Sequence, residues 1–301
     1  MKRQLWRGGP NTAKGADYYW NVNKQSAHIL DEIRKAFTEG DQAKAERLTR
    51  QNFNSEVPYE GSREKPFRFG SFTTMGEFYV ETGLNIIGMS DYKRILSLDS
   101  AMAVVQFKKD DVAYQRNYFI SYPANVLVMR FSADRPGKQN LIFSYAPNPV
   151  STGSMVAQGD NGLVYSAALD NNGMKYVVRI QAETKGGTLV NRNGKLTVKG
   201  ADEVVFYVTA DTDYKANFAP DFKNPKTYVG VNPVETTGQW LANAVAKGYS
   251  ALLNEHYQDY AALFNRVKLN LNPTVKTGNL PTGQRLRNYR KGQPVYYLEE
   301  L

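Results

Sequence analysis

Paired carboxylates are the side chains of this sequence with the plainest capacity for chemistry. They occur as Asp110-Asp111, Asp202-Glu203 and Asp211/Asp213. Two carboxyl groups that flank a sugar linkage can serve as acid and base in glycoside hydrolysis. Each of these pairs, however, lies at a predicted turn or strand end, where Asp is common because it hydrogen-bonds the backbone. We therefore expect structural roles for all of them, with a solvated loop rather than a calcium site at 211–213.

Other catalytic arrangements find no support in the sequence. The chain has no cysteine, and its two histidines, His28 and His256, stand at helical spacing among apolar residues. We expect both to pack on helix faces. Neither a zinc-binding pattern nor a Gly-x-Ser-x-Gly nucleophile motif occurs. The sequence thus predicts no catalytic residue, no metal and no cofactor within this chain.

An aromatic segment near the start is the best binding candidate. Its leading residues are Trp6, Arg7, Trp20 and Asn21, with Tyr18, Tyr19, Asn11 and Asn23 between or beside them. Flat aromatic faces suit the C–H faces of a sugar ring, while amide and guanidinium groups suit its hydroxyls. Two interpretations stay open, a sugar-binding segment and a set of packing anchors between domains. The second is favoured.

The elements that would position these residues are mainly β-strands. Apolar residues alternate through 100–107 and again through 112–120, with a polar turn between them, and a third apolar run covers 126–131. Such short runs separated by turns are typical of an antiparallel meander. Asn193-Gly194 adds a strong two-residue hairpin signal, because both central positions of that turn need positive φ. The fold class predicted is a two-sheet antiparallel β-sandwich.

Helices are expected at two places outside the strands. Apolar spacing predicts one helix over 26–37 and a second over 43–53, with Asp41 as the N-cap of the second. Two further helices are predicted over 240–249 and 250–264. We therefore divide the chain into a β-sandwich domain, 1–235, with a helical insertion at about 26–53, and a helical linker, 236–301.

Four blocks of sequence resemble the N-terminal β-sandwich domain of the glycoside hydrolase family 95 α-L-fucosidases. They are DYKRILSLDSAMAVVQF, YQRNYFISYPANVLVMRFSADRPG, GGTLVNRNGKLTVKGADEVVFYVTADTDY and KGYSALLNEHYQDYAALFNRVKLNL. The blocks occur in the order of that family, between LWRGGP near the start and PTGQRLRNY near the end. The resemblance covers nearly the whole chain.

This resemblance carries expectations about the ends and the function. It implies that about two strands that precede Leu5 in family members, and the (α/α)6 catalytic barrel that would follow 294–301, have no counterpart here. The family's catalytic residues lie on that barrel, so none is matched. Arg7 stands where the family usually has a small residue. The parent enzyme would hydrolyse terminal α-linked L-fucose of glycans with inversion.

The implied partners are therefore a catalytic barrel domain and, through the parent enzyme, a fucosylated oligosaccharide. Two alternatives remain open, a free-standing carbohydrate-binding sandwich and a structural domain that joins a separately encoded barrel. No secretion signal is present, so the compartment stays unassigned, although the resemblance suggests a periplasmic or secreted bacterial parent.

Charge and hydropathy argue against two classes of partner. The formal net charge is +9, yet residues 17–260 carry 27 basic and 27 acidic side chains. The excess lies at the two ends, without a helix-turn-helix or an aromatic-basic RNA motif, so nucleic acid is not the expected partner. No apolar run approaches the ~20 residues of a membrane span. We expect neither nucleic acid nor membrane to be bound.

Overall fold

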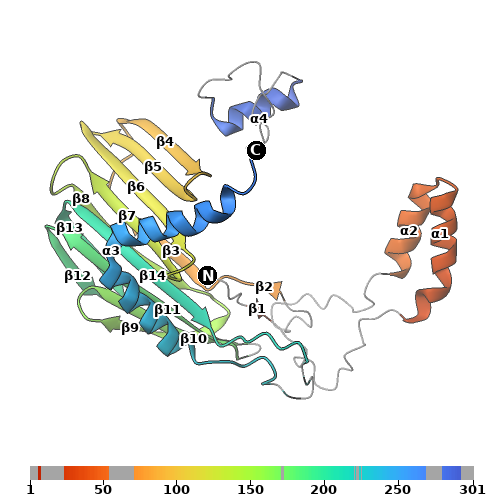
Figure 1. Cartoon of the computed structure of the whole chain (residues 1–301). Coiled ribbons are helices and arrows are strands. Elements are labelled where there is room, and N and C mark those ends of the chain that lie inside the picture. Colours follow the sequence, from red (N-terminus) through yellow and green to blue (C-terminus); the bar gives the residue numbers. More distant parts are fainter. Residues whose placement is uncertain are drawn as a thin grey trace.

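The structure is a computed structural model, and it describes most of the chain. The described residues are 6–7, 24–53, 71–170, 173–219, 221, 224, 226–268 and 280–292. Within them, two antiparallel sheets lie face to face and one long helix crosses the outer face of the larger sheet (Figure 1). The predicted β-sandwich with a helical pair and a C-terminal helical region is confirmed.

The larger sheet has eight strands among the described residues. In spatial order they are β4 (Met89–Ser97), β5 (Met102–Lys109), β6 (Val112–Ser121), β7 (Val126–Ala133), β14 (Glu203–Thr212), β11 (Lys175–Lys185), β10 (Gly162–Leu169) and β9 (Ser151–Gln158). Two consecutive meanders, β4 to β7 and β9 to β11, are thus joined by β14, which comes last in the sequence. The order makes β14 the central link of the sheet.

The smaller sheet packs against the inner face of the larger sheet. Its order is β12 (Thr188–Arg192), β13 (Lys195–Ala201), β8 (Gln139–Pro147) and β3 (Gly76–Glu81). A separate short pair joins β1 (Trp6–Arg7) to β2 (Ser71–Phe72). The predicted turn at Asn193-Gly194 is confirmed, because Arg192 pairs with Lys195 and both turn residues have positive φ, 51° and 70°.

The main core lies between the two sheets and follows from the alternation of each strand. Phe131 of β7, Phe143 of β8 and Phe206 of β14 are fully buried there. The rings of Phe143 and Phe206 stack across the sheets with centroids 4.6 Å apart. Burying one such side chain stabilises the fold by about 1.5–3 kcal/mol. These contacts fix how the larger sheet lies on the smaller one.

A helical pair precedes the sandwich strands. A 3-10 turn, η1 (Lys24–Ile29), leads into α1 (Leu30–Thr38), which packs on α2 (Gln42–Asn52) through Ile33, Ala36, Ala45 and Leu48. Asp41 caps α2 as predicted, since its side chain accepts a hydrogen bond of 3.0 Å from the Lys44 N–H. The prediction that His28 packs on a helix face is wrong, because His28 is exposed. The three-residue period of η1 turns Ser26 and Ile29 inward instead.

Two helices follow the last strand. The first, α3 (Pro233–Phe264), begins at the N-cap Asn232 and contains one non-helical residue, Gly248, with φ 74° and ψ 169°. The two predicted helices thus exist but meet at Gly248, and the first begins earlier than expected. The second, α4 (Thr282–Arg290), is short and basic. Within the described ranges, no helix is long and apolar enough to cross a membrane.

Candidate functional site at the elbow of helix α3

The predicted sugar-binding residues are only partly within the described chain. Trp6 and Arg7 form β1 and pair with Phe72 and Ser71. Trp20 and Asn21 lie outside the described residues, as do Tyr18 and Tyr19. The binding role of Trp6, Arg7, Trp20 and Asn21 therefore stays a prediction.

Two of the acid pairs have the structural roles expected from the sequence. Asp110 and Asp111 form the two-residue turn between β5 and β6, both with positive φ. Asp202 accepts a 2.6 Å hydrogen bond from the Gly137 N–H and so ties a loop to the end of β13. Turn geometry thus explains Asp110 and Asp111, and a long-range hydrogen bond to the backbone explains Asp202.

The third acid group differs from expectation. The predicted solvated loop at 211–213 is wrong, because Asp211, Thr212 and Asp213 are buried at the end of β14. The strand runs further than expected, so Asp211 and Thr212 stay paired with β11, and the Asp213 N–H, just beyond the strand, donates to the Lys175 carbonyl oxygen. Asp213 Oδ1 accepts a 3.0 Å hydrogen bond from the Lys175 N–H. Burial nevertheless raises the pKa of Asp213, against that bond. Among the described residues, no group of three acids or histidines is placed to hold a metal.

Glu203 is an acidic residue held by two cationic side chains. It lies on the outer face of the larger sheet, where Arg130 of β7 donates through Nη2 and through Nε, the latter at 2.8 Å. Lys185 of β11 approaches the other carboxylate oxygen at 3.0 Å. Burial would raise the pKa of Glu203, but the hydrogen bonds and charges of Arg130 and Lys185 outweigh it and lower that pKa overall. A carboxylate held ionised in this way cannot serve as a general acid near neutral pH.

Tyrosines connect this ion pair to helix α3. The Tyr207 hydroxyl donates to Glu183 Oε2 at 2.8 Å and is also hydrogen-bonded to the backbone of Tyr249. Burial, followed by the neighbouring carboxylates Glu183 and Glu203, raises the pKa of Tyr207, so its hydroxyl stays protonated. The guanidinium of Arg130 lies 5.0 Å from the centre of the Tyr249 ring. These contacts join β7, β11 and β14 to the residue that follows Gly248.

An open hollow of about 780 Å³ lies beside this cluster. Its walls come from β7, β11, β14 and the elbow of α3, which is the bend at Gly248, and they include Asn161, Lys247 and Ser250. Lys247 is itself paired with Glu255 at 2.7 Å. The hollow therefore offers both donors and acceptors, and each of its cations, Arg130, Lys185 and Lys247, contacts a carboxylate. Such a surface suits a neutral, hydroxyl-rich ligand or a polar segment of polypeptide better than a free ion.

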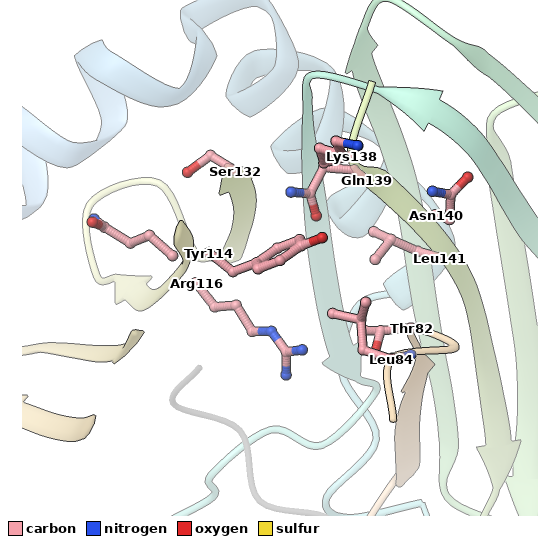
Figure 2. A pocket seen from close by; sticks show the side chains of 10 residues that line it. Thr82, Leu84, Tyr114, Arg116, Ser132, Lys138, Gln139, Asn140 and Leu141 are labelled. Carbon is pink, nitrogen blue, oxygen red and sulfur yellow. The ribbon is translucent and has the colours of Figure 1, made fainter. Parts of the chain in front are cut away.

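A second, much smaller cavity lies where β6 and β7 meet β8 (Figure 2). Tyr114, Arg116, Gln139 and Leu141 are among its lining residues. The amide nitrogen of Gln139 is buried and has no hydrogen-bond partner among the described residues. The cavity volume is about 10 Å³, which is room for a single water molecule. This site can satisfy Gln139 with water but cannot hold a sugar.

His256 has the packed role predicted for it. Its ring is buried 5.0 Å from the Phe119 ring. Its Nε2 lies 3.0 Å from the carbonyl oxygen of Ser100 and 3.2 Å from that of Ala101, which anchors the second half of α3 to the β4–β5 turn. The residue is therefore structural, and it belongs to the attachment of α3 rather than to a catalytic site.

Family models match the chain in two parts. A model described as "Glycosyl hydrolase family 65, N-terminal domain" matches residues 2–217. A second, described as "Glycosyl hydrolase family 95 catalytic domain", matches residues 248–301. The second match begins at Gly248, the elbow of α3, and thus well before the 294–301 segment expected from the sequence to begin the barrel. The family 65 description was not anticipated from the sequence, whereas the family 95 resemblance is confirmed.

Curated proteins with similar sequences are named as fucosidases. "Probable alpha-fucosidase A" of Aspergillus niger is 29% identical over 99% of this chain and 36% of its own length. "Alpha-L-fucosidase 2" of Arabidopsis thaliana is 23% identical over 99% of this chain and 36% of its own length. "Probable alpha-fucosidase A" of Aspergillus oryzae is 23% identical over 99% and 40%. The chain spans little more than a third of the length of these relatives.

Proposed function

Because the chain belongs to the family described as glycosyl hydrolase family 65, N-terminal domain, we propose that it is the non-catalytic β-sandwich part of an α-L-fucosidase-like glycoside hydrolase. The observation that carries this proposal is the order of the two family matches, with the N-terminal domain before Gly248 and the catalytic-domain match after it. The substrate proposed for the complete enzyme is a glycan with terminal α-linked L-fucose, since the similar curated proteins are named as fucosidases.

The chemistry of the described residues supports a non-catalytic role. Glu203 is ionised and held by Arg130 and Lys185, and Glu183 accepts from Tyr207. Inverting hydrolysis needs one carboxyl group that stays protonated to donate to the leaving oxygen and another that activates water. The lowered pKa of Glu203 rules it out as the acid, and Glu183 accepts a hydrogen bond from Tyr207 instead of facing a leaving group. The acid and base are therefore assigned to the catalytic domain rather than to this sandwich.

Release of L-fucose from a 2′-fucosylated oligosaccharide tests the proposal. We expect no turnover by the 301-residue chain alone. The Aspergillus niger relative is truncated so that only the part beyond the aligned region remains, and this part alone should not release fucose. Fusion of the 301-residue chain to its N-terminus should restore fucose release. Turnover by the 301-residue chain that disappears on a single Asp or Glu substitution would instead make it a complete enzyme and overturn the proposal.

A second candidate function is a free-standing carbohydrate-binding domain. The open hollow at the elbow favours it, because its ion-paired side chains and its tyrosines present both hydrogen-bond donors and acceptors. Affinity electrophoresis in gels that contain soluble fucosylated or neutral polysaccharide separates the two candidates. Retardation of the purified chain that is lost in Tyr207→Phe but kept in the exposed Tyr257→Phe would favour the binding domain.

A further inference from the structure

The elbow of α3 depends on a conformation that glycine alone adopts readily. Gly248 has φ 74° and ψ 169°, a combination that costs other residues on the order of 1–3 kcal/mol. A Cβ added at Gly248 would meet no atom within 4 Å. Glycine is therefore required here for the backbone bend and not for space. The match to the catalytic-domain model begins at this same residue.

Tyr249, the next residue, is held by the sandwich at several points. Its hydroxyl accepts a 3.0 Å hydrogen bond from Asn117 Nδ2, and its ring lies beneath Arg130 and edge-on to Phe119. Its backbone is hydrogen-bonded to the Tyr207 hydroxyl. Three strands, β6, β7 and β14, thus contact a single residue just beyond the bend.

Two further contacts keep the second half of α3 in line. His256 lies about two turns beyond Tyr249 and is hydrogen-bonded to the β4–β5 turn. Lys247 and Glu255, on opposite sides of Gly248, form a 2.7 Å ion pair that spans the bend. In Figure 1 the two halves of α3 run in different directions across the larger sheet. The direction of the second half is therefore set by contacts with the sheet and not by the helix itself.

We infer that Tyr249 is a positioning residue that fixes the angle of the elbow. Through this angle the sandwich sets the direction of the segment that leads into the catalytic-domain match. The fixed angle is a property of the described residues, and its importance for the orientation of a catalytic domain rests on the function proposed above. Gly248 permits the bend, and Tyr249, with Asn117, Arg130 and Tyr207, selects one angle.

Spin labels on either side of the elbow can measure this angle directly. The natural chain has no cysteine, so Asn243→Cys and Gln258→Cys, both at exposed helix positions, give a single labelled pair. Pulsed dipolar spectroscopy on the full chain then reports the distribution of distances between the labels. We expect one narrow distribution in the parent and a distribution at least twice as wide in Tyr249→Ala. Circular dichroism and thermal melting verify that the sandwich of each variant is folded.

Matched variants separate positioning from general loosening of the helix. Tyr257→Ala, at an exposed tyrosine of the same half-helix, should leave the distribution narrow. Tyr249→Phe keeps the ring and the backbone contact, and should restore the narrow distribution that Tyr249→Ala loses. Gly248→Ala should shift the mean distance, whereas Gly238→Ala, in the regular first half, should not.

A folded Tyr249→Ala variant with the parent distribution would overturn the inference. Equal broadening in Tyr257→Ala would overturn it as well, because the effect would then belong to any tyrosine of the helix. The measurement needs no turnover, so it stands apart from the fucose-release assay. A narrow distance distribution in a chain that does not restore fucose release in the fusion would refute the proposed function alone. A broad distribution in a chain that does restore it would refute the inference alone.

Discussion

Glu203 and Asp213 are both withdrawn from water, yet their surroundings move their pKa values in opposite directions. Glu203 faces two cations, Arg130 and Lys185, which outweigh its burial and lower its pKa. Asp213 has the Lys175 N–H as a neutral donor and no ion pair among the interactions described for it, so burial raises its pKa. The two carboxylates, at opposite ends of β14, therefore make opposite contributions to the pH dependence of stability.

Replacement of Glu203 by Gln should remove stability at neutral pH. A carboxyl with a lowered pKa in the folded state stabilises the fold above its unfolded pKa of about 4.3, and this contribution is lost as the pH falls through the folded pKa. We expect the free energy of unfolding of Glu203→Gln to be about 1–2 kcal/mol lower than that of the parent at pH 7, and this difference to approach zero below about pH 4. Thermal or urea unfolding across this range measures it.

The exposed pair of Glu46 and Arg50 provides the control for that experiment, since Glu46→Gln should change stability by less than about 0.5 kcal/mol. A pH-independent loss in Glu203→Gln would show that packing, and not charge, explains the change.

Replacement of Asp213 by Asn should act in the opposite sense. Because the folded pKa of Asp213 is raised, the parent loses stability as the pH rises from its unfolded pKa of about 3.9 through the folded value. Asn keeps an oxygen that can accept from the Lys175 N–H and removes the buried charge. Asp213→Asn should therefore melt higher than the parent at pH 8 and close to it at pH 4, while Asp160→Asn, at an exposed turn, should follow the parent at both. A variant that melts lower at pH 8 contradicts the argument.

At the scale of elements, the outer edge of β4 is the least protected part of the larger sheet. β4 is an end strand, and large apolar side chains on it and just before it are exposed, namely Ile86, Ile87, Tyr92, Ile95 and Leu96. An exposed apolar edge strand is a template for pairing with another chain. The charged residues Lys93 and Arg94 interrupt this surface but do not cover it.

Lysine substitutions at this edge should reduce self-association of the 301-residue chain. We expect Ile87→Lys with Leu96→Lys to lower the concentration-dependent light scattering of the parent at least severalfold, with little change in melting temperature, because both side chains are exposed. Val156→Lys, on β9 at the opposite edge of the same sheet, is the comparison. Equal scattering by the double variant and the parent would place the association elsewhere.

Sequence patterns predicted the elements better than they predicted their surroundings. Alternation and turn residues were sufficient for the strands from 102 to 131 and for the hairpin at 193–194, because both depend on local backbone preferences. Asp211 and Asp213 were misjudged, since their burial depends on β11 and on the loop at 230, which are distant or unpatterned in sequence. Arg130 and Tyr207 were missed for the same reason, although charged or hydroxyl-bearing side chains within apolar strands were the available signal.

At the scale of the whole molecule, the distribution of charge matters more than its sum. Basic side chains cluster before residue 17 and after residue 260, and α4 contributes Arg285, Arg287 and Arg290. The described sandwich between them is close to neutral. Clustered basic residues attract phosphate without reading sequence, and this attraction falls steeply with salt.

Nucleic-acid binding by the purified chain should accordingly be weak and sensitive to salt. In fluorescence anisotropy with a labelled 20-base-pair duplex, we expect binding at 20 mM salt and none detectable at 200 mM. Arg287→Gln with Arg290→Gln should weaken the low-salt binding, whereas Lys108→Gln on the β5–β6 hairpin should not. Sequence-selective binding that persists at 200 mM salt would mean that nucleic acid is a genuine partner.

The position of β14 also has a consequence for synthesis on the ribosome. The strand lies between β7 and β11, yet it is the last strand of the sheet to be translated. Until residue 212 has left the exit tunnel, β7 and β11 each lack the strand that pairs with them in the finished sheet. Open edges of this kind attract chaperones and incorrect partners. The larger sheet can therefore be completed only after β14 has emerged, and a ribosome that pauses shortly before residue 203 prolongs the time in which β7 and β11 lack this partner.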